Sequence, residues 1–196
     1  VEAKTAILAV PAFVARRITP SAGVLPVRES SPWLVANLHV TRPIDPDAAW
    51  DSVVYDGLGL GYVDARHQLT PPQARTVWTY FRAYGAGDAR ATRAALLEAP
   101  YEQLGASVLA DLAGPHPELA SRLDAMELVV WGHAMPRPTV GFRNGGAQAP
   151  IALSPRVSYG HADSGGMALF EESQRAGVLA AEAALDALGL GAETWT

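Results

Sequence analysis

The segment with the most chemical content lies near the C-terminal end, where an expected strand is followed by an acidic, glycine-rich turn and a long expected helix. The start of a helix has about four unpaired backbone N–H groups and a partial positive charge. Gly165 and Gly166 leave the backbone bare in front of that start, so a phosphate or an electron-rich carbonyl oxygen could approach closely. Asp163 could accept hydrogen bonds from sugar hydroxyls beside such a phosphate. The alternative is that Asp163 or Ser164 only caps the helix, and the residues alone slightly favour this alternative.

Composition excludes or weakens other kinds of chemistry. The chain of 196 residues has no cysteine, which excludes disulfides, thiolate nucleophiles, iron–sulfur clusters and cysteine-ligated zinc. Its five histidines show no spacing typical of metal ligands, so we expect no bound metal. A G-x-S-x-G turn is absent, and Lys4 is the single lysine, so neither a hydrolase nor a catalytic lysine is expected. The net charge of −5 argues against a nucleic-acid partner. No apolar run reaches the roughly 18 residues that a membrane span needs.

The spacing of apolar residues predicts the elements that must position this turn. Four consecutive strands in the middle of the chain make a plausible antiparallel sheet, with a hairpin at Pro71-Pro72. The expected strands are Ile7–Val10, Leu34–Thr41, Trp50–Tyr55, Gly61–Gln68, Arg75–Tyr84, Met126–Gly132 and Arg156–His161. The expected helices are Ala12–Ile18, Ala89–Glu98, Pro100–Leu112, Glu118–Leu123 and Met167–Leu188.

The C-terminal residues resemble the FAD-binding segment of flavin-dependent amine-oxidase-like proteins. The resemblance rests on His161-Ala162-Asp163, on the helix sequence Phe170–Gly177 and on Ala180-Ala181. In that family the acidic residue, here Asp163, meets the ribityl or pyrophosphate part of FAD, and the following helix points its first turn at the flavin. The resemblance therefore implies FAD as the cofactor. The cofactor-binding residues that it implies are His161, Ala162, Asp163, Gly165, Gly166, Met167, Leu169 and Phe170.

Similarity to the same family extends upstream over nearly the whole chain. Lys4–Pro11 is similar to the strand that leads from the FAD domain into the substrate domain. Leu60-Gly61-Tyr62 and Gly132-His133-Ala134-Met135 look like motifs of an uncharacterised bacterial branch. The resemblance implies an α+β fold, in which an antiparallel or mixed-sheet substrate domain with helices joins the last strand and helix of a Rossmann-like FAD-binding domain. We expect an FAD-domain strand at residues 1–11, the substrate domain at 12–148 and the C-terminal FAD-binding strand, turn and helix at 149–196.

Some features of the family are absent. The dinucleotide fingerprint G-x-G-x-x-G does not occur. We therefore expect an N-terminal FAD-binding half of the same protein before Val1, and weak FAD binding by this chain alone. The lysine that amine oxidases commonly place near the flavin is missing from Leu34–Thr41, and Leu169 stands near a position that is often aromatic. These departures weaken the expectation of amine oxidation and leave that of FAD binding untouched.

The resemblance places the segment Trp131–Pro138 beside the flavin, and two of its residues are candidate catalytic groups. His133 could carry a proton, because imidazole titrates near neutral pH. Arg137 could pair with an anionic substrate group or stabilise reduced flavin. The alternatives are that His133 bonds a backbone carbonyl and that Arg137 braces the loop. One of four further residues on sheet strands is expected to meet substrate, while most belong to the core: Tyr62, His67, Trp78 and Tyr80.

The sequence thus predicts the C-terminal part of an FAD-dependent oxidoreductase that transfers hydride from a small organic substrate to flavin. The alternative is a non-redox α+β ligand-binding or interaction domain that uses the same helix start for a small anion or nucleotide. The expected partners are a small-molecule substrate and the N-terminal FAD-binding half, without nucleic acid or a membrane span. The expected compartment is the cytoplasm.

Overall fold

The computed structural model describes residues 2–26, 28–42, 44, 49–68, 75–137, 140 and 151–191. The chain divides into two compact units, each with its own sheet and hydrophobic core. Unit 1 combines residues 1–30 with 135–196, and unit 2 comprises residues 31–134. The boundary between the units therefore falls within two strands that carry the chain from one unit into the other.

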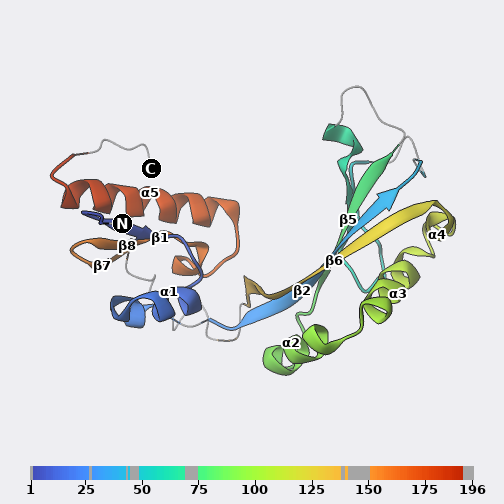
Figure 1. The fold of residues 1–196 in the computed structure, drawn as a ribbon, viewed down its shortest axis with the longest axis horizontal. Helices are drawn as coiled ribbons and strands as arrows, with labels where there is room; N and C mark the ends of the chain where they lie inside the picture. Colours follow the sequence, from blue (N-terminus) through green and yellow to red (C-terminus); the bar gives the residue numbers. More distant parts are fainter. Residues whose placement is uncertain are drawn as a thin grey trace. The chain divides into compact units, whose positions relative to one another are not determined.

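Unit 1 is built from the two ends of the chain (Figure 1). Its three-stranded sheet has the order β1-β8-β7, in which β1 is parallel to β8 and β7 is antiparallel to β8. Figure 1 shows α5 on one side of this sheet and α1 on the other. The elements are β1 Ala6–Leu8, α1 Ala12–Ile18, the 3-10 helix η1 Pro20–Val24, β7 Ala152–Ser154, β8 Val157–Tyr159, the 3-10 helix η3 Ala162–Ser164 and α5 Phe170–Ala187.

Strand β8 and the glycine that follows it explain the two helical layers of unit 1. Tyr159 is fully buried in a cluster that includes Ala12 and Ala15 of α1. On the α5 side, Gly160 lies so close to the helix that a Cβ there would be 3.1 Å from the Cβ of Ala180. Small residues on this contact allow helix and sheet to approach closely. The close contact between α5 and the sheet therefore requires a residue without Cβ at Gly160.

Unit 2 contains a five-stranded sheet with the order β3-β4-β5-β2-β6. Each strand in the row β3-β4-β5-β2 is antiparallel to its neighbour, and β6 lies beside β2. Two helices, α2 and α3, connect β5 to the short helix before β6. The elements are β2 Ser30–Val40, β3 Asp51–Ser52, β4 Gly61–Asp64, the 3-10 helix η2 Ala65–Gln68, β5 Thr76–Ala83, α2 Ala89–Glu98, α3 Tyr101–Leu112, α4 Leu119–Arg122 and β6 Leu123–Pro136.

One face of the unit 2 sheet packs on its helices and forms the main core. Alternate residues of β2, from Leu34 to Val40, are buried on this face because side chains of a strand alternate between its two sides. They pack with Val108 and Leu112 of α3. Burial of large apolar side chains in this way contributes about 1.5–3 kcal/mol each. The helices therefore define an inner face of the sheet and leave an outer face.

Asp111 of α3 holds the loop that precedes β4. Its carboxylate accepts hydrogen bonds from Leu58 N at 2.6 Å, Gly59 N at 2.8 Å and the Tyr80 hydroxyl at 2.7 Å. A Cβ at Gly59 would lie 2.4 Å from the Tyr80 ring, so the loop backbone touches this ring directly. Burial raises the pKa of Asp111, but the hydrogen bonds from Leu58, Tyr80 and Gly59 lower it by more, and the net shift is downward.

The outer edge of β6 is covered by side chains of the neighbouring helices. Arg93 of α2 donates a hydrogen bond from Nε to the carbonyl oxygen of Gly132. The Tyr101 hydroxyl of α3 donates to the carbonyl oxygen of Met126. An edge strand presents unpaired carbonyl groups that invite pairing with other chains, and these two contacts occupy part of that edge.

The structure confirms the predicted α+β class and most elements, with several shifted bounds. The expected strand at Trp50–Tyr55 is reduced to β3, and the end of the one expected at Gly61–Gln68 is the 3-10 helix η2. Strand β7 was not predicted. The antiparallel pairing of β4 with β5 agrees with the expected hairpin, whose turn at Pro71-Pro72 lies outside the described residues.

The division into units also differs from the expected domain limits. Helix α1 and η1, expected within a substrate domain at 12–148, lie in unit 1 because they pack on Tyr159. The two compact units meet at 30/31 and 134/135, and the expected domain limits at 11/12 and 148/149 stay a prediction.

Candidate functional site

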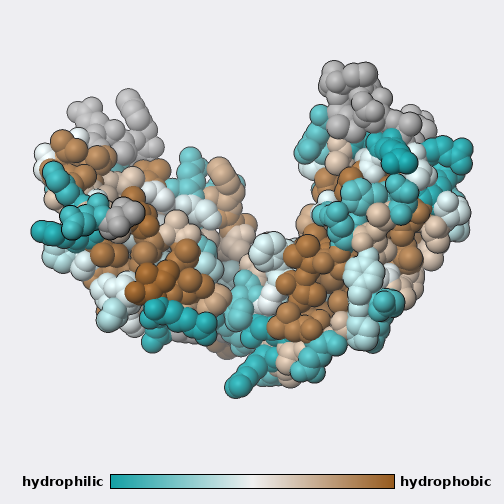
Figure 2. Space-filling view, viewed as in Figure 1, coloured by the Kyte–Doolittle hydropathy of each residue, from teal (hydrophilic) through white to brown (hydrophobic). Residues whose placement is uncertain are grey.

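The outer face of the unit 2 sheet carries the side chains that point away from α2 and α3. Strand alternation, with the pairing of β5 with β2 and β4, assigns these side chains to one face, and none of them belongs to the buried core cluster. Hydrophobic side chains are visible at the surface near β2 and β6 in Figure 2. The outer face consists of Trp33, Val35, Asn37 and His39 of β2, Val63 of β4, Val77, Thr79 and Phe81 of β5, and Glu127, Val129, Trp131 and His133 of β6.

These residues form rows across the strands. Val35 pairs with Phe81, Asn37 with Thr79 and His39 with Val77. On the other side of β2, His39 Nε2 lies 3.5 Å from Glu127 Oε1. Strand β6 lies beside β2 at this edge of the sheet.

The structure places the candidate catalytic residue His133 on the outer face of β6, where it is exposed. His133 also takes part in an interaction with another residue of the chain. Its role in proton transfer stays a prediction.

Arg137, the second candidate catalytic residue, lies in unit 1 and braces the chain beside Glu29. Its guanidinium Nη1 is 2.8 Å from Glu29 Oε1, and its backbone N–H donates to Glu29 O at 2.7 Å. The guanidinium is mostly buried while Glu29 is half-exposed. This arrangement matches the alternative in which Arg137 stabilises the local backbone.

The turn between β8 and α5 holds the predicted cofactor-binding residues, and the structure divides them by exposure. Ala162 and Gly166 are buried, and His161, Asp163 and Gly165 are half-buried. Three apolar residues at the start of α5 are exposed to solvent: Met167, Leu169 and Phe170. A ligand that approaches this end of unit 1 would therefore contact these three exposed side chains before the more buried residues of the turn.

Asp163 neither caps α5 nor points free into solvent. Its Oδ2 accepts a hydrogen bond of 2.8 Å from Ala12 N, the first residue of α1, where Pro11 offers no side-chain cap. Its carbonyl oxygen accepts a hydrogen bond from Arg28 Nε at 3.1 Å. Burial raises the pKa of Asp163, but the neighbouring His161 side chain, the hydrogen bond from Ala12 N and the charge of Arg28 bring it below its ordinary value. The acid thus ties the N-terminal helix of the chain to the C-terminal turn.

The backbone N–H groups expected at the two glycines are already used inside the turn. Gly165 N and Gly166 N both donate to Ala162 O, and Gly166 has the positive φ of +80° that glycine tolerates. His161 Nδ1 accepts from Asp163 N at 3.1 Å and so closes the same turn. The first-turn N–H groups of α5 lack partners inside the helix, and Leu169 at its cap position has no side-chain hydrogen bond to give them. The helix begins three residues later than expected, with the acids Glu171 and Glu172 in its first turn.

Of the four strand residues of which one was expected to meet substrate and most to belong to the core, three are core residues. Tyr62, Trp78 and Tyr80 are buried on the inner face, with Tyr62 and Trp78 stacked at 4.1 Å. His67 lies in η2, where its ring is 5.3 Å from Trp50. The sequence already indicated which face of the sheet is exposed. The apolar alternation in Leu34–Thr41 assigns alternate residues, from Leu34 to Val40, to the core. Trp33 and Val35 are therefore left on the outer face.

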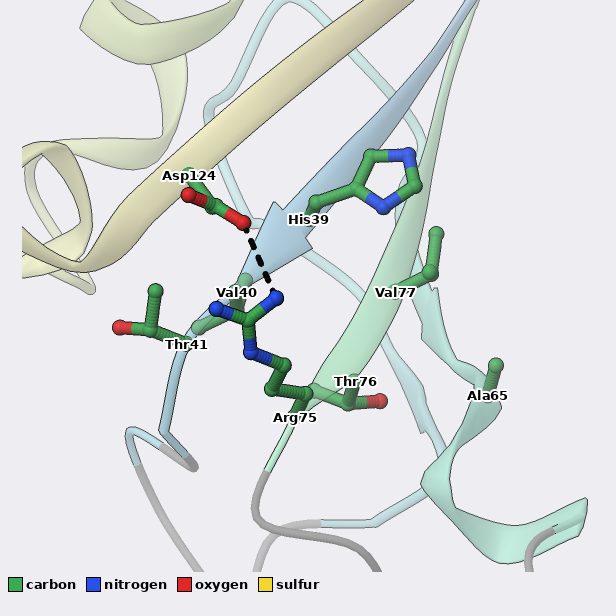
Figure 3. Close-up of a pocket in the computed structure, with 8 residues that line it drawn as sticks. All are labelled: His39, Val40, Thr41, Ala65, Arg75, Thr76, Val77 and Asp124. Carbon is green, nitrogen blue, oxygen red and sulfur yellow. Dashed lines mark ion pairs between the residues drawn. The ribbon is translucent and has the colours of Figure 1, made fainter.

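A small pocket opens at the far end of the same sheet (Figure 3). It has a volume of about 210 Å³ and lies between the end of β2 and the starts of β5 and β6. Arg75 and Asp124 form an exposed ion pair of 3.2 Å at its side. Among the described residues, no group of three or more acidic or histidine side chains is arranged to hold a metal ion.

Comparison with solved structures now identifies the fold. The chain has the fold of part of the amine oxidases. Cyclohexylamine oxidase from Brevibacterium oxydans matches 96% of this chain with a TM-score of 0.66 and 14% sequence identity. A mutant of putrescine oxidase matches 96% of it with a TM-score of 0.64 and 17% identity. The predicted resemblance is confirmed at the level of the fold.

The chain spans less than half the length of these structures, 44% and 43% respectively. No protein-family model matches the sequence, and the search of curated proteins found no match either. Within the described part of the chain, no helix combines the length and apolar character that crossing a membrane requires.

Proposed function

We propose that this chain is the C-terminal part of an FAD-dependent oxidoreductase of the amine-oxidase type, in which unit 1 contributes to FAD binding and unit 2 contacts a small organic substrate. The observation that carries the proposal is the start of α5: its uncapped N–H groups adjoin the exposed apolar side chains of Met167, Leu169 and Phe170. A flavin ring is flat, largely apolar and edged with carbonyl oxygens, so it fits this combination. The likeness in fold to amine oxidases supports the same assignment.

The alternative of a domain that binds only a small anion or nucleotide phosphate is less well supported by the same residues. An anion would use the N–H groups of the helix start but would leave three large apolar side chains in water. Two acids in the first turn, Glu171 and Glu172, also oppose a compact anion there. A ligand with a broad apolar ring removes both objections.

The edge strand β1 supports the proposal that the FAD-binding sheet continues into an N-terminal half. Parallel strands are normally buried on both faces and flanked by further strands. Strand β1 pairs with β8 on one side, and Ile7 is 45% exposed. A further parallel strand from an N-terminal half would cover this edge, and the same half would supply the pyrophosphate site that the sequence of this chain lacks.

In the proposed enzyme, FAD held at the start of α5 would supply the hydride acceptor for the substrate. The residues of this chain would position the two molecules: the N–H groups at the start of α5 would hold the cofactor, and Asp163 keeps the turn and α1 in place. On unit 2, the outer face holds the substrate, and His133 receives or returns a proton at its imidazole nitrogen.

Replacing Phe170 by aspartate in the full-length protein is expected to raise the dissociation constant for FAD at least about tenfold, because a charge replaces apolar contact area. The fold should persist, since Phe170 is 75% exposed and an acid suits the first turn of a helix. FAD retention is measured by absorbance after gel filtration, and folding by circular dichroism.

The matched control is Leu190→Asp, because Leu190 is also exposed and lies just beyond the other end of α5. This variant should retain FAD like the parent protein. Equal FAD retention in both variants would show that the start of α5 does not contact the cofactor.

A further inference from the structure

The side chain of Glu172, in the first turn of α5, reaches back onto the turn that precedes the helix. A Cβ added to Gly165 would overlap the Oε2 atom of Glu172 and would lie 2.7 Å from its Cδ. The carboxylate therefore rests on the bare backbone of Gly165. Glu172 is half-buried in this position, whereas its neighbours Glu171 and Ser173 are exposed. Side chains of a helix lean towards its N-terminal end, which gives Glu172 this reach.

The same position puts a negative charge at the start of the helix. Leu169 occupies the N-cap position without a side-chain hydrogen bond, and Glu172 is the third residue after it. An acid at this third position interacts favourably with the partial positive charge of a helix start. In the chain without cofactor, Glu172 thus takes up the space beside Gly165 and part of the attraction of the helix start for electron-rich groups.

Packing and the charge of the helix start hold the Glu172 carboxylate on the turn. Within the part of the chain that the structure describes, no hydrogen bond or ion pair joins it to another residue. The N–H group of Gly165 donates to Ala162 O instead. The side chain of a glutamate rotates about several bonds, so a change of rotamer moves the carboxylate off the turn and leaves the backbone in place. This contact can therefore open.

We propose that Glu172 makes an autoinhibitory contact: it covers Gly165 in the cofactor-free protein and moves away when FAD binds at the start of α5. The identity of the ligand rests on the proposed function, and the inference adds what that ligand displaces. A ligand can touch the backbone of Gly165 only after the carboxylate leaves, and the electron-rich groups of FAD would otherwise meet a like charge. Such a covered population raises the apparent dissociation constant by the inverse of the open fraction.

The dissociation constant of the full-length protein for FAD tests the proposal. Glu172→Ala removes the covering carboxylate and is expected to lower this constant at least about threefold. Glu171→Ala is the matched control, because Glu171 lies in the same helical turn and carries the same charge, but is exposed so that water screens it. This variant should change the constant less than about twofold. Flavin fluorescence during titration of FAD into flavin-depleted protein gives the constants, and circular dichroism checks folding.

The contact itself is tested by NMR on the 196-residue chain without flavin, where nuclear Overhauser effects between the Hα atoms of Gly165 and the Glu172 side chain are expected. Three results would overturn the proposal: absence of these effects, an unchanged or higher dissociation constant for FAD in Glu172→Ala, or equal effects of the two glutamate substitutions. The last result would identify a general effect of charge. If Phe170→Asp weakens FAD binding while Glu172→Ala does not strengthen it, the proposed function stands and the autoinhibitory contact is refuted.

Discussion

Asp111→Ala is expected to lower the free energy of unfolding of unit 2 by about 2–4 kcal/mol. The substitution removes the acceptor of three hydrogen bonds and leaves Leu58 N, Gly59 N and the Tyr80 hydroxyl without it. Hydrogen bonds to a charged group contribute about 1.5–3 kcal/mol each, and partial exposure of the loop reduces their sum. Urea unfolding measures the loss, and faster amide exchange in β4 and β5 locates it.

The pH dependence of this contribution follows from the direction of the pKa shift. The folded-state pKa of Asp111 lies below its ordinary value of 3.8. The stabilisation is therefore fully present above that ordinary value and is lost as the pH falls through the folded-state pKa. Asp111→Asn, which keeps one acceptor oxygen, should lose less stability than Asp111→Ala and should abolish this part of the acid dependence. A loss below about 1 kcal/mol for Asp111→Ala would contradict the assigned role.

Asp163→Ala is expected to destabilise unit 1 by about 1–3 kcal/mol, because it leaves Ala12 N at the start of α1 without its acceptor. Amide exchange at Ala12 and in the following turn of α1 should accelerate. The folded-state pKa of Asp163 is also lowered, so its contribution is likewise present above the ordinary value of 3.8 and lost as the pH falls through the folded-state pKa. Thermal unfolding and hydrogen exchange of the chain without cofactor measure these effects.

Asp186→Ala is the control for this substitution, since Asp186 is an exposed acid near the C-terminal end of α5. It should not lower the stability of unit 1. In the full-length protein, Asp163→Ala should also weaken FAD retention, through the loss of order in α1 and the turn. Unchanged exchange at Ala12 would show that Asp163 does not hold α1.

Local sequence patterns were sufficient for much of the fold. Alternation along Leu34–Thr41 identifies β2 and its buried side, and runs of helix formers identify α2 and α3. Short strands were harder to predict from the sequence. Strands β3 and β7 have only two and three residues, and they form only because they pair with neighbouring strands. The start of α5 was placed at Met167 because an acidic and glycine-rich turn precedes it. The helix begins at Phe170 because this turn closes on itself through Ala162 O.

The candidate site was predictable only where its signal is local. The sequence of the turn and helix identified the resemblance to FAD-binding proteins and the residues around Asp163. The partner of its carboxylate, Ala12, lies 151 residues away in sequence, and no local pattern reports such a contact. The ion pair of Arg137 with Glu29 could not be predicted for the same reason, because the two residues are far apart in the sequence. The outer face needed the register of β2 with β5, which pairs Val35 with Phe81.

The FAD content of the purified full-length protein tests the central claim most directly. Precipitation of the protein and quantification of the released flavin should give one FAD per chain, and Phe170→Asp should reduce this ratio while Leu190→Asp should not. A folded full-length protein that contains no flavin, and binds none when FAD is added, would contradict the assignment of this chain to an FAD-dependent oxidoreductase.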